Sequence, residues 1–147
     1  MKSQIILCSG GARSGKSEFA ERLALATEGR KAYVATGQAF DDEMIDRIKK
    51  HQERRGEIWN NFEVPLHLAK EWQNISQSAD VILIDCLTMF TTNHMMAHGS
   101  IQGQQDANQL EATVLTELET LLASIKSCEG KTVIFVTNEI GLGIVPD

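Results

Sequence analysis

The sequence predicts an α/β fold in which a mainly parallel sheet is flanked by helices. Two observations lead to this prediction. Short apolar runs rich in β-branched residues alternate with longer stretches of helical periodicity, as in repeated strand–helix–strand units around a buried sheet. The first of these runs leads into a glycine-rich stretch that opens a helix, Gly10-Gly11-Ala12-Arg13-Ser14-Gly15-Lys16-Ser17. At 147 residues, the chain is expected to form a single domain over 1–147.

The glycine-rich stretch reads Gly, four residues, Gly-Lys-Ser, which is the pattern of a phosphate-binding loop, or P-loop. Glycines let several backbone N–H groups point at one anion, and the helix that begins at Lys16 adds its positive N-terminal end. Lys16 is expected to reach the β- and γ-phosphates, and Ser17 to ligate Mg²⁺. Residues Gly10 to Ser17 are therefore predicted to bind a nucleotide in a P-loop NTPase-like fold. The alternative is a flexible glycine turn between a strand and a helix.

The strands and the first helix follow from the same periodicity. Strands are expected at Gln4–Cys8, Ala32–Thr36, Val81–Asp85 and Thr132–Thr137, with a further extended segment at Glu57–Val64. The first helix is predicted over Lys16–Glu28, and its apolar residues at helical spacing are Phe19, Leu23 and Ala26. Gly29 is expected to end this helix as the residue after its C-cap.

A highly charged helix is predicted over Asp41–Arg55. Acidic residues occupy its first turn and basic residues its last, which suits the helix dipole, and Gly56 follows. One face carries Met44, Ile48, His51 and Arg55. Because this apolar stripe is narrow, the helix is expected at the surface or over a cleft. On these grounds alone, His51 is a surface histidine.

Two more helices are predicted to pack on the sheet. The first follows Pro65 and buries Leu68, Ala69, Trp72 and Ile75. Both tryptophans, Trp59 and Trp72, are expected in the core rather than against a ligand. The longest helix is predicted over Asp106–Cys128, beginning at a capping box formed by Asp106 and Gln109. Its apolar stripe consists of Leu110, Val114, Leu118, Leu121 and Ile125.

The Met-rich stretch before the longest helix carries His94 and His98, four residues apart. That spacing can hold a metal ion on a helix. Because no third ligand is nearby in the sequence, an exposed pair of histidines is the favoured interpretation.

The run Val81–Asp85 consists of four apolar residues and a terminal carboxylate. P-loop enzymes use a strand of this form to hold Mg²⁺, usually through water. The pattern is weak alone because buried strands often end in Asp. Together with the P-loop it favours a metal role for Asp85, beside Ser17.

Composition excludes several functional classes. The net charge of -6 argues against nucleic acid or an anionic membrane surface as a general partner. The three cysteines, Cys8, Cys86 and Cys128, are widely spaced and predict neither a disulfide framework nor a zinc site. Neither a membrane-spanning apolar run nor a signal-peptide pattern is present, so a cytoplasmic location is expected.

The residues alone therefore predict a domain that binds a nucleoside triphosphate with Mg²⁺ and transfers a phosphoryl group. The sequence lacks an Asn-Lys-x-Asp guanine signature, so the choice between ATP and GTP stays open, as does the acceptor. One alternative is a kinase of another small metabolite without nucleotidyl transfer. Another is a non-catalytic, nucleotide-gated interaction module that uses the Met-rich stretch as its contact surface.

Four stretches spread along the chain carry a family resemblance. They are the P-loop, Tyr33-Val34-Ala35-Thr36, the run from Asp41-Asp42-Glu43-Met44 through Arg47-Ile48 to His51 and Arg54, and Thr137-Asn138-Glu139-Ile140-Gly141-Leu142-Gly143-Ile144-Val145-Pro146. Together they resemble the bifunctional adenosylcobinamide kinase / adenosylcobinamide-phosphate guanylyltransferase of cobalamin biosynthesis. The helix that bears His51 and the closing glycine-rich stretch are specific to that family, whereas the P-loop is not.

The resemblance implies two reactions. The first phosphorylates the aminopropanol hydroxyl of adenosylcobinamide with ATP or GTP. The second transfers GMP from GTP to that phosphate, giving adenosylcobinamide-GDP and pyrophosphate. The family uses a histidine nucleophile in the second reaction, and His51 matches its position. A neutral imidazole suits this role near pH 7, with Lys16, Arg13 and Mg²⁺ offsetting the charge of the triphosphate.

The resemblance also implies further nucleotide contacts, which are Ala35, Thr36, Gly37, Gln52, Glu53, Arg54, Arg55, Glu63 and Asp85. For Glu63 the alternative is a solvated acid on an extended strand, and Asp85 could serve the nucleotide or the metal. The family continues beyond the closing glycine-rich stretch with a helix and a last strand. Because this sequence stops at Asp147, the sheet is expected to lack those two elements. The family also implies a homotrimer.

Overall fold

The computed structural model describes residues 2–10, 15–37 and 42–138. Predictions for Gly11, Ala12, Arg13 and Ser14, and for the closing stretch after Asn138, lie outside these residues. Five strands form one fully parallel sheet in the order β1-β5-β4-β2-β3. The strands are β1 (Gln4–Gly10), β2 (Lys31–Ala35), β3 (Trp59–Glu63), β4 (Val81–Asp85) and β5 (Thr132–Asn138). The predicted α/β fold with a parallel sheet is confirmed.

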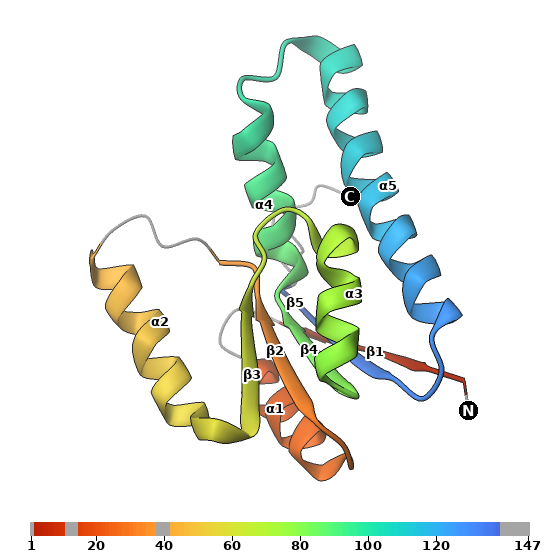
Figure 1. Ribbon diagram of the computed structural model, residues 1–147. Helices are drawn as coiled ribbons and strands as arrows, with labels where there is room; N and C mark the ends of the chain where they lie inside the picture. The colour runs from red at the N-terminus through yellow and green to blue at the C-terminus, as the bar shows by residue number, and fades with distance from the viewer. Residues whose placement is uncertain (1, 11–14, 38–41, 139–147) are drawn as a thin grey trace.

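Helices flank the sheet. They are α1 (Lys16–Ala26), α2 (Asp42–Arg55), α3 (Leu68–Ser78), α4 (Leu87–His98) and α5 (Gly103–Ser127), with a short 3₁₀ turn, η1, at Gly56–Ile58. Figure 1 shows α1 on one side of the sheet and α3 and α5 on the other. Helices α4 and α5 form a hairpin that extends beyond the sheet, whereas α2 stands apart and rejoins the sheet at its C-terminal end (Figure 1).

Side chains of β4 alternate between two apolar layers, because a parallel strand in the middle of a sheet is covered on both faces. Val81 and Leu83 pack in the layer that contains α1, and Ile82 and Ile84 pack in the layer that contains α3 and α5. All four are at most 1% exposed. Burial on both faces explains why four consecutive residues of this strand are apolar.

The predicted buried faces of α3 and α5 are confirmed, except that Ala69 of α3 is half-buried. Leu68, Trp72 and Ile75 of α3 are buried, and so are four of the five predicted positions of α5, the fifth, Leu118, being half-buried. Trp59 and Trp72 are core residues, as predicted, at 5% and 4% exposure. In the described part of the chain, no helix is long and apolar enough to cross a membrane.

The apolar residues at helical spacing in α1 are only partly buried, since Leu23 is half-buried against the core and Ala26 is exposed. Phe19 is 51% exposed, whereas Ala20 and Ala24 are fully buried against the sheet. Small side chains let the helix lie close to β4 and β5, so the larger apolar residue turns outward. The helix also ends at Ala26 with Thr27 as its C-cap, not at Gly29. Gly29 lies in the following turn with φ of +127°, where a Cβ would stand 2.8 Å from Cβ of Asp80.

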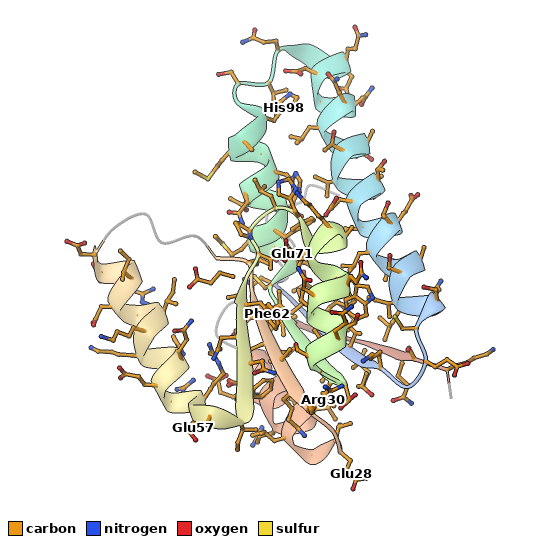
Figure 2. The ribbon with its side chains drawn as sticks, viewed as in Figure 1. Glu28, Arg30, Glu57, Phe62, Glu71 and His98 are labelled. Atoms are coloured by element: carbon orange, nitrogen blue, oxygen red, sulfur yellow. The ribbon has the colours of Figure 1, made fainter. Side chains whose placement is uncertain are left out.

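The extended segment expected at Glu57–Val64 forms β3, but it begins two residues late. The reason is η1, a turn that starts at Gly56 in a left-handed conformation and carries the chain from α2 to the sheet. Figure 2 labels Glu57 at this corner, where α2 passes into β3.

The capping box predicted for the longest helix is wrong. Helix α5 begins three residues before Asp106, and its N-cap residue is Gln102. The Asp106 carboxylate instead accepts a hydrogen bond from the Gln102 N–H at 2.8 Å and lies 2.6 Å from Nε2 of His98. Asp106 thus stabilises the helix start from inside the first turn, because a negative charge is favourable there.

The two histidines of α4 are half-buried, not exposed as predicted. Nε2 of His94 lies 3.1 Å from the carbonyl oxygen of Leu66, and its ring packs edge-on against Phe90. His98 lies at the outer end of α4 (Figure 2), where it contacts Asp106. The two side chains therefore have separate structural partners.

Candidate nucleotide site

The chemistry-bearing residues gather near the carboxyl ends of β2 and β4. In a parallel sheet these ends meet at one edge, which is where such folds bind ligands. Ala35 of β2 lies directly opposite Asp85 of β4 in the register of the sheet. Gly15, in a left-handed conformation with φ of 77°, caps the helix that begins with Lys16 and Ser17. Only glycine adopts that conformation without strain, so the P-loop pattern fits the start of α1.

A cavity of about 620 Å³ lies at this place. It is lined by Gly15, Lys16, Ser17, Glu18, Glu21, Tyr33, Ala35, Ile48, His51, Arg54, Arg55 and Asp85. These residues come from the start of α1, the ends of β2 and β4, and the inner side of α2. Its size and mixed polar lining suit a nucleotide.

Eight of the predicted site residues that the structure describes meet in this cavity. They are Gly15, Lys16, Ser17, Ala35, His51, Arg54, Arg55 and Asp85. The described site residues outside its lining are Gly10, Thr36, Gly37, Gln52, Glu53 and Glu63. Glu53 and Glu63 are exposed, on α2 and at the end of β3 respectively. Contact of these six with a nucleotide stays a prediction.

Thr36 supports the site from beneath. It is fully buried, and its hydroxyl donates to the Cys86 carbonyl at 2.6 Å and accepts from the Cys86 N–H at 2.8 Å. The Asn93 amide donates to the Thr36 carbonyl at 2.6 Å and to the Pro65 carbonyl at 3.1 Å. The chain after β2 is thereby tied to the chain after β4, which holds the neighbouring Ala35 and Asp85 in register.

A hydrogen bond from Tyr33 orients Asp85. The Tyr33 hydroxyl donates to its Oδ2 at 2.5 Å. Burial raises the pKa of Tyr33 strongly, and the negative charge of Asp85 and this hydrogen bond raise it further. The phenol therefore stays protonated at all ordinary pH values and acts as a donor.

The donor set fits Mg²⁺. The Ser17 hydroxyl and the Asp85 carboxylate line the same cavity, and both offer the hard oxygen atoms that Mg²⁺ prefers. Among the described residues, no three His, Cys, Asp or Glu side chains cluster in a way that could hold a metal ion. A site with few protein ligands is what Mg²⁺ bound through nucleotide phosphates requires, because the ion keeps several waters.

Besides Lys16 of α1, the basic side chains of the lining come from the last turn and a half of α2. Nη2 of Arg54 lies 3.3 Å from Nδ1 of His51 and 4.0 Å from a carboxylate oxygen of Glu21 on α1. The guanidinium of Arg55 lies over the ring of Tyr33, 3.6 Å from the ring centre. The expectation that α2 lies over a cleft is confirmed, since Ile48, His51, Arg54 and Arg55 all line the cavity.

Four residues of the lining, Glu18, Glu21, Tyr33 and Ile48, were not predicted as site residues. A signal for Tyr33 exists, because side chains two apart on a strand share a face and Tyr33 lies two before Ala35. Glu18 and Glu21 follow from helical spacing once the start of α1 is placed at Lys16.

The profile of one protein family, described as cobinamide kinase / cobinamide phosphate guanyltransferase, matches residues 6–147. The chain belongs to this family. Two relatives are both named bifunctional adenosylcobalamin biosynthesis protein CobU. The one from Escherichia coli (strain K12) is 37% identical over 145 residues, covering 97% of this chain and 79% of the relative. The one from Salmonella typhimurium (strain LT2) is 38% identical over 148 residues, with the same coverage.

A third relative, from Pseudomonas aeruginosa, is named bifunctional adenosylcobalamin biosynthesis protein CobP. It is 40% identical over 140 residues, covering 95% of this chain and 74% of the relative. The family places the chain among enzymes with a kinase and a guanylyltransferase activity. A solved structure of an ATPase from a bacterial type III secretion system superposes with a TM-score of 0.62 at 13% identity, covering 92% of this chain and 44% of that one. That likeness confirms the P-loop NTPase-like fold.

Proposed function

We propose that this chain phosphorylates adenosylcobinamide with ATP or GTP and then transfers GMP from GTP, through a guanylylated His51, to adenosylcobinamide phosphate. The product is adenosylcobinamide-GDP. The observation that carries the proposal is that His51, Lys16 and Asp85 line one cavity although they come from three separate elements. Family membership supports the two reactions, and the shared cavity supports the roles of these residues.

In the transfer step, a neutral imidazole nitrogen of His51 attacks the α-phosphorus of GTP. The new P–N bond forms as the bond to the bridging oxygen breaks, and pyrophosphate leaves with that oxygen and its electron pair. An oxygen of adenosylcobinamide phosphate then attacks the same phosphorus and the P–N bond breaks, which regenerates the imidazole. Splitting the transfer into two displacements gives each its own in-line geometry.

Positive groups of the chain stabilise the charge that moves during both displacements. Lys16 binds the β- and γ-phosphates at the start of α1, and Arg54 lies beside His51, where the α-phosphate arrives. Ser17 and Asp85 would hold Mg²⁺. When bound, the ion supplies charge neutralisation between the phosphate oxygens.

In the kinase step, the same loop presents the γ-phosphate to the hydroxyl of adenosylcobinamide. The hydroxyl oxygen forms a bond to the γ-phosphorus, the bond to the β-phosphate oxygen breaks, and the hydroxyl proton passes to solvent or a carboxylate. Positioning and electrostatics provide most of the catalysis in such transfers.

The decisive experiment incubates the protein with Mg²⁺ and GTP labelled either at the α- or at the γ-phosphate. The proposal expects acid-labile label on the protein from the α-labelled nucleotide alone. His51→Ala should lose this label while it keeps nucleotide binding, because Lys16 and the P-loop are unchanged. The exposed Lys49 on the same helix provides the matched control, since Lys49→Ala keeps every cavity residue.

Three outcomes would contradict the proposal. Kinase turnover without protein label, or label that persists in His51→Ala, would indicate a kinase that does not use His51 for nucleotidyl transfer. Nucleotide binding without product in the presence of adenosylcobinamide would indicate a non-catalytic module. Assembly as a homotrimer stays a prediction, which the mass of the protein in solution tests.

A further inference from the structure

Tyr33 is contacted from three directions by residues of three other elements. Its hydroxyl donates to Asp85 of β4, and its ring packs edge-on against Trp59 of β3, with ring centres 5.9 Å apart and planes at 84°. One face of the ring is covered by the Arg55 guanidinium, 3.6 Å from the ring centre. Trp59 is buried, so the tyrosine ring rests on the core and offers a fixed surface to α2.

Arg55 is the last residue of α2 and is held at two points. Besides lying on Tyr33, its guanidinium donates to Oδ1 of Asn61 through Nη2 at 2.9 Å and Nε at 3.3 Å. A cation over an aromatic face is attracted by the electrons of the ring, and more strongly when it is partly shielded from water. Both partners belong to neighbouring strands, so Arg55 fixes the end of α2 against β2 and β3.

The described residues of α2 before Arg55 make few contacts that could hold the helix against the sheet. Apart from Met44, whose side chain is not described, only Ile48, Gln52 and Arg55 are even half-buried in this helix. The other described link is the 4.0 Å approach of Arg54 to Glu21. His51 lies one helical turn before Arg55, on the same side of the helix. The position of the imidazole over the cavity therefore depends on how Arg55 is seated.

We propose that Tyr33 is a positioning residue for the nucleotidyl-transfer step, because its ring seats Arg55 and so fixes where α2 holds His51. Its hydroxyl has a separate task, orienting Asp85. This inference rests on the function proposed above. Reacting atoms must be aligned closely for displacement at phosphorus, and a misplacement of about 1 Å can cost about a hundredfold in rate. Tyr33 itself need not contact the reacting atoms.

The two tasks can be separated by substitution. Tyr33→Phe keeps the ring and removes the hydroxyl, whereas Tyr33→Leu removes both. We expect Tyr33→Phe to take up α-label from GTP within about threefold of the unaltered protein, and Tyr33→Leu to do so at least about thirtyfold more slowly. Asn61→Ala, which removes only the second support of Arg55, should fall between them. Kinase turnover with ATP should not distinguish Tyr33→Leu from Tyr33→Phe, since that step does not use His51.

A second measurement tests the contact between Arg55 and Tyr33 without any reaction. Hydrogen exchange at the amides of residues 51–55 should be faster in Tyr33→Leu than in Tyr33→Phe, because the end of α2 loses its support. The exposed substitution Lys49→Ala should change neither exchange nor labelling. Thermal unfolding of each variant shows whether the fold itself is kept.

The outcomes separate this inference from the proposed function. If the unaltered protein takes up no α-label, the proposed nucleotidyl transfer is wrong, and the role of Tyr33 in that step is wrong as well. If the protein is labelled but Tyr33→Phe and Tyr33→Leu are labelled equally fast, only the role of Tyr33 is overturned. An equal loss of labelling, kinase turnover and nucleotide affinity in Tyr33→Leu would also overturn it, because that pattern indicates general damage to the fold.

Discussion

Nη2 of Arg54 lies 3.3 Å from Nδ1 of His51. A guanidinium has only donors, so a hydrogen bond between them needs the lone pair of the imidazole on Nδ1 and its proton on Nε2. This arrangement selects one tautomer of the ring. In the transfer step proposed above, Nδ1 would then be the attacking nitrogen, with the Arg54 donor turned to a phosphate oxygen.

Removing the Arg54 side chain should therefore slow guanylylation. We expect Arg54→Ala to lower the rate of label uptake from α-labelled GTP by about a hundredfold, as for the loss of one preorganised donor. Arg54→Lys should recover part of this loss because it restores the charge. Magnetic resonance of the labelled protein should place the phosphorus on Nδ1, and an adduct on Nε2 would contradict this tautomer.

The oxygen atoms of Ser17 and Asp85 predict a Mg²⁺ dependence. Ser17→Ala and Asp85→Asn should each raise the Mg²⁺ concentration needed for half-maximal kinase turnover by about tenfold or more. The double variant should lose less than the sum of the two free-energy changes if both side chains serve one ion. Unchanged Mg²⁺ curves in both single variants would remove these residues from the metal site.

Much of this site could be predicted from the sequence, because its parts are local patterns. The P-loop, the carboxylate at the end of β4 and the charged helix α2 each depend on spacing within one element. Their meeting follows from the parallel sheet, which brings strand ends to one edge. The contact between Arg55 and the Tyr33 ring could not be predicted. It joins α2 to β2, and the distance and angle between these elements depend on the turn at Gly56.

The wrong predictions about the helices have the same origin. Phe19 lies at helical spacing with Leu23, but it is exposed, and the fully buried residues of α1 are the smaller Ala20 and Ala24. Spacing made Asp106 an N-cap, whereas the structure uses it inside the first turn because His98 lies opposite. Both outcomes depend on distances between elements, and a linear pattern holds no information about these.

A charged cluster next to Gly29 predicts a pH-dependent stability. Asp80 accepts hydrogen bonds from the backbone N–H and the side chain of Arg30, at 2.9 and 3.1 Å. The side-chain hydrogen bond, then the backbone one, lowers the pKa of Asp80 to about 2 from 3.8. Because the folded pKa is depressed, the stabilisation is complete above pH 3.8 and is lost as the pH falls toward 2.

We therefore expect Asp80→Asn to be less stable than the unaltered protein at neutral pH. The side chain is 37% exposed, so solvent screening limits the loss to about 1 kcal/mol. The difference should shrink as denaturant unfolding is repeated at lower pH and disappear near pH 2. A constant difference across this range would indicate a packing defect instead of a lost charge interaction.

Gly29 should not tolerate a side chain. Its φ of +127° is rarely adopted by other residues, and a Cβ would meet Cβ of Asp80 at 2.8 Å. Gly29→Ala is expected to lower the free energy of unfolding by about 1–3 kcal/mol, through backbone strain. Gly99→Ala is the matched control for a glycine with positive φ, since its Cβ would enter open space. The difference between the losses of unfolding free energy in Gly29→Ala and Gly99→Ala measures the clash with Asp80.

The pairing of β1 with β5 has a consequence during biosynthesis. Gln4 pairs with Thr132, and among the described strands β5 is the one that β1 contacts in the sheet. A ribosome therefore releases the first strand long before the partner that completes its ladder has been made. Such distant pairings slow folding and leave apolar segments uncovered in the meantime. The nascent chain should depend on chaperones until β5 emerges and inserts between β1 and β4.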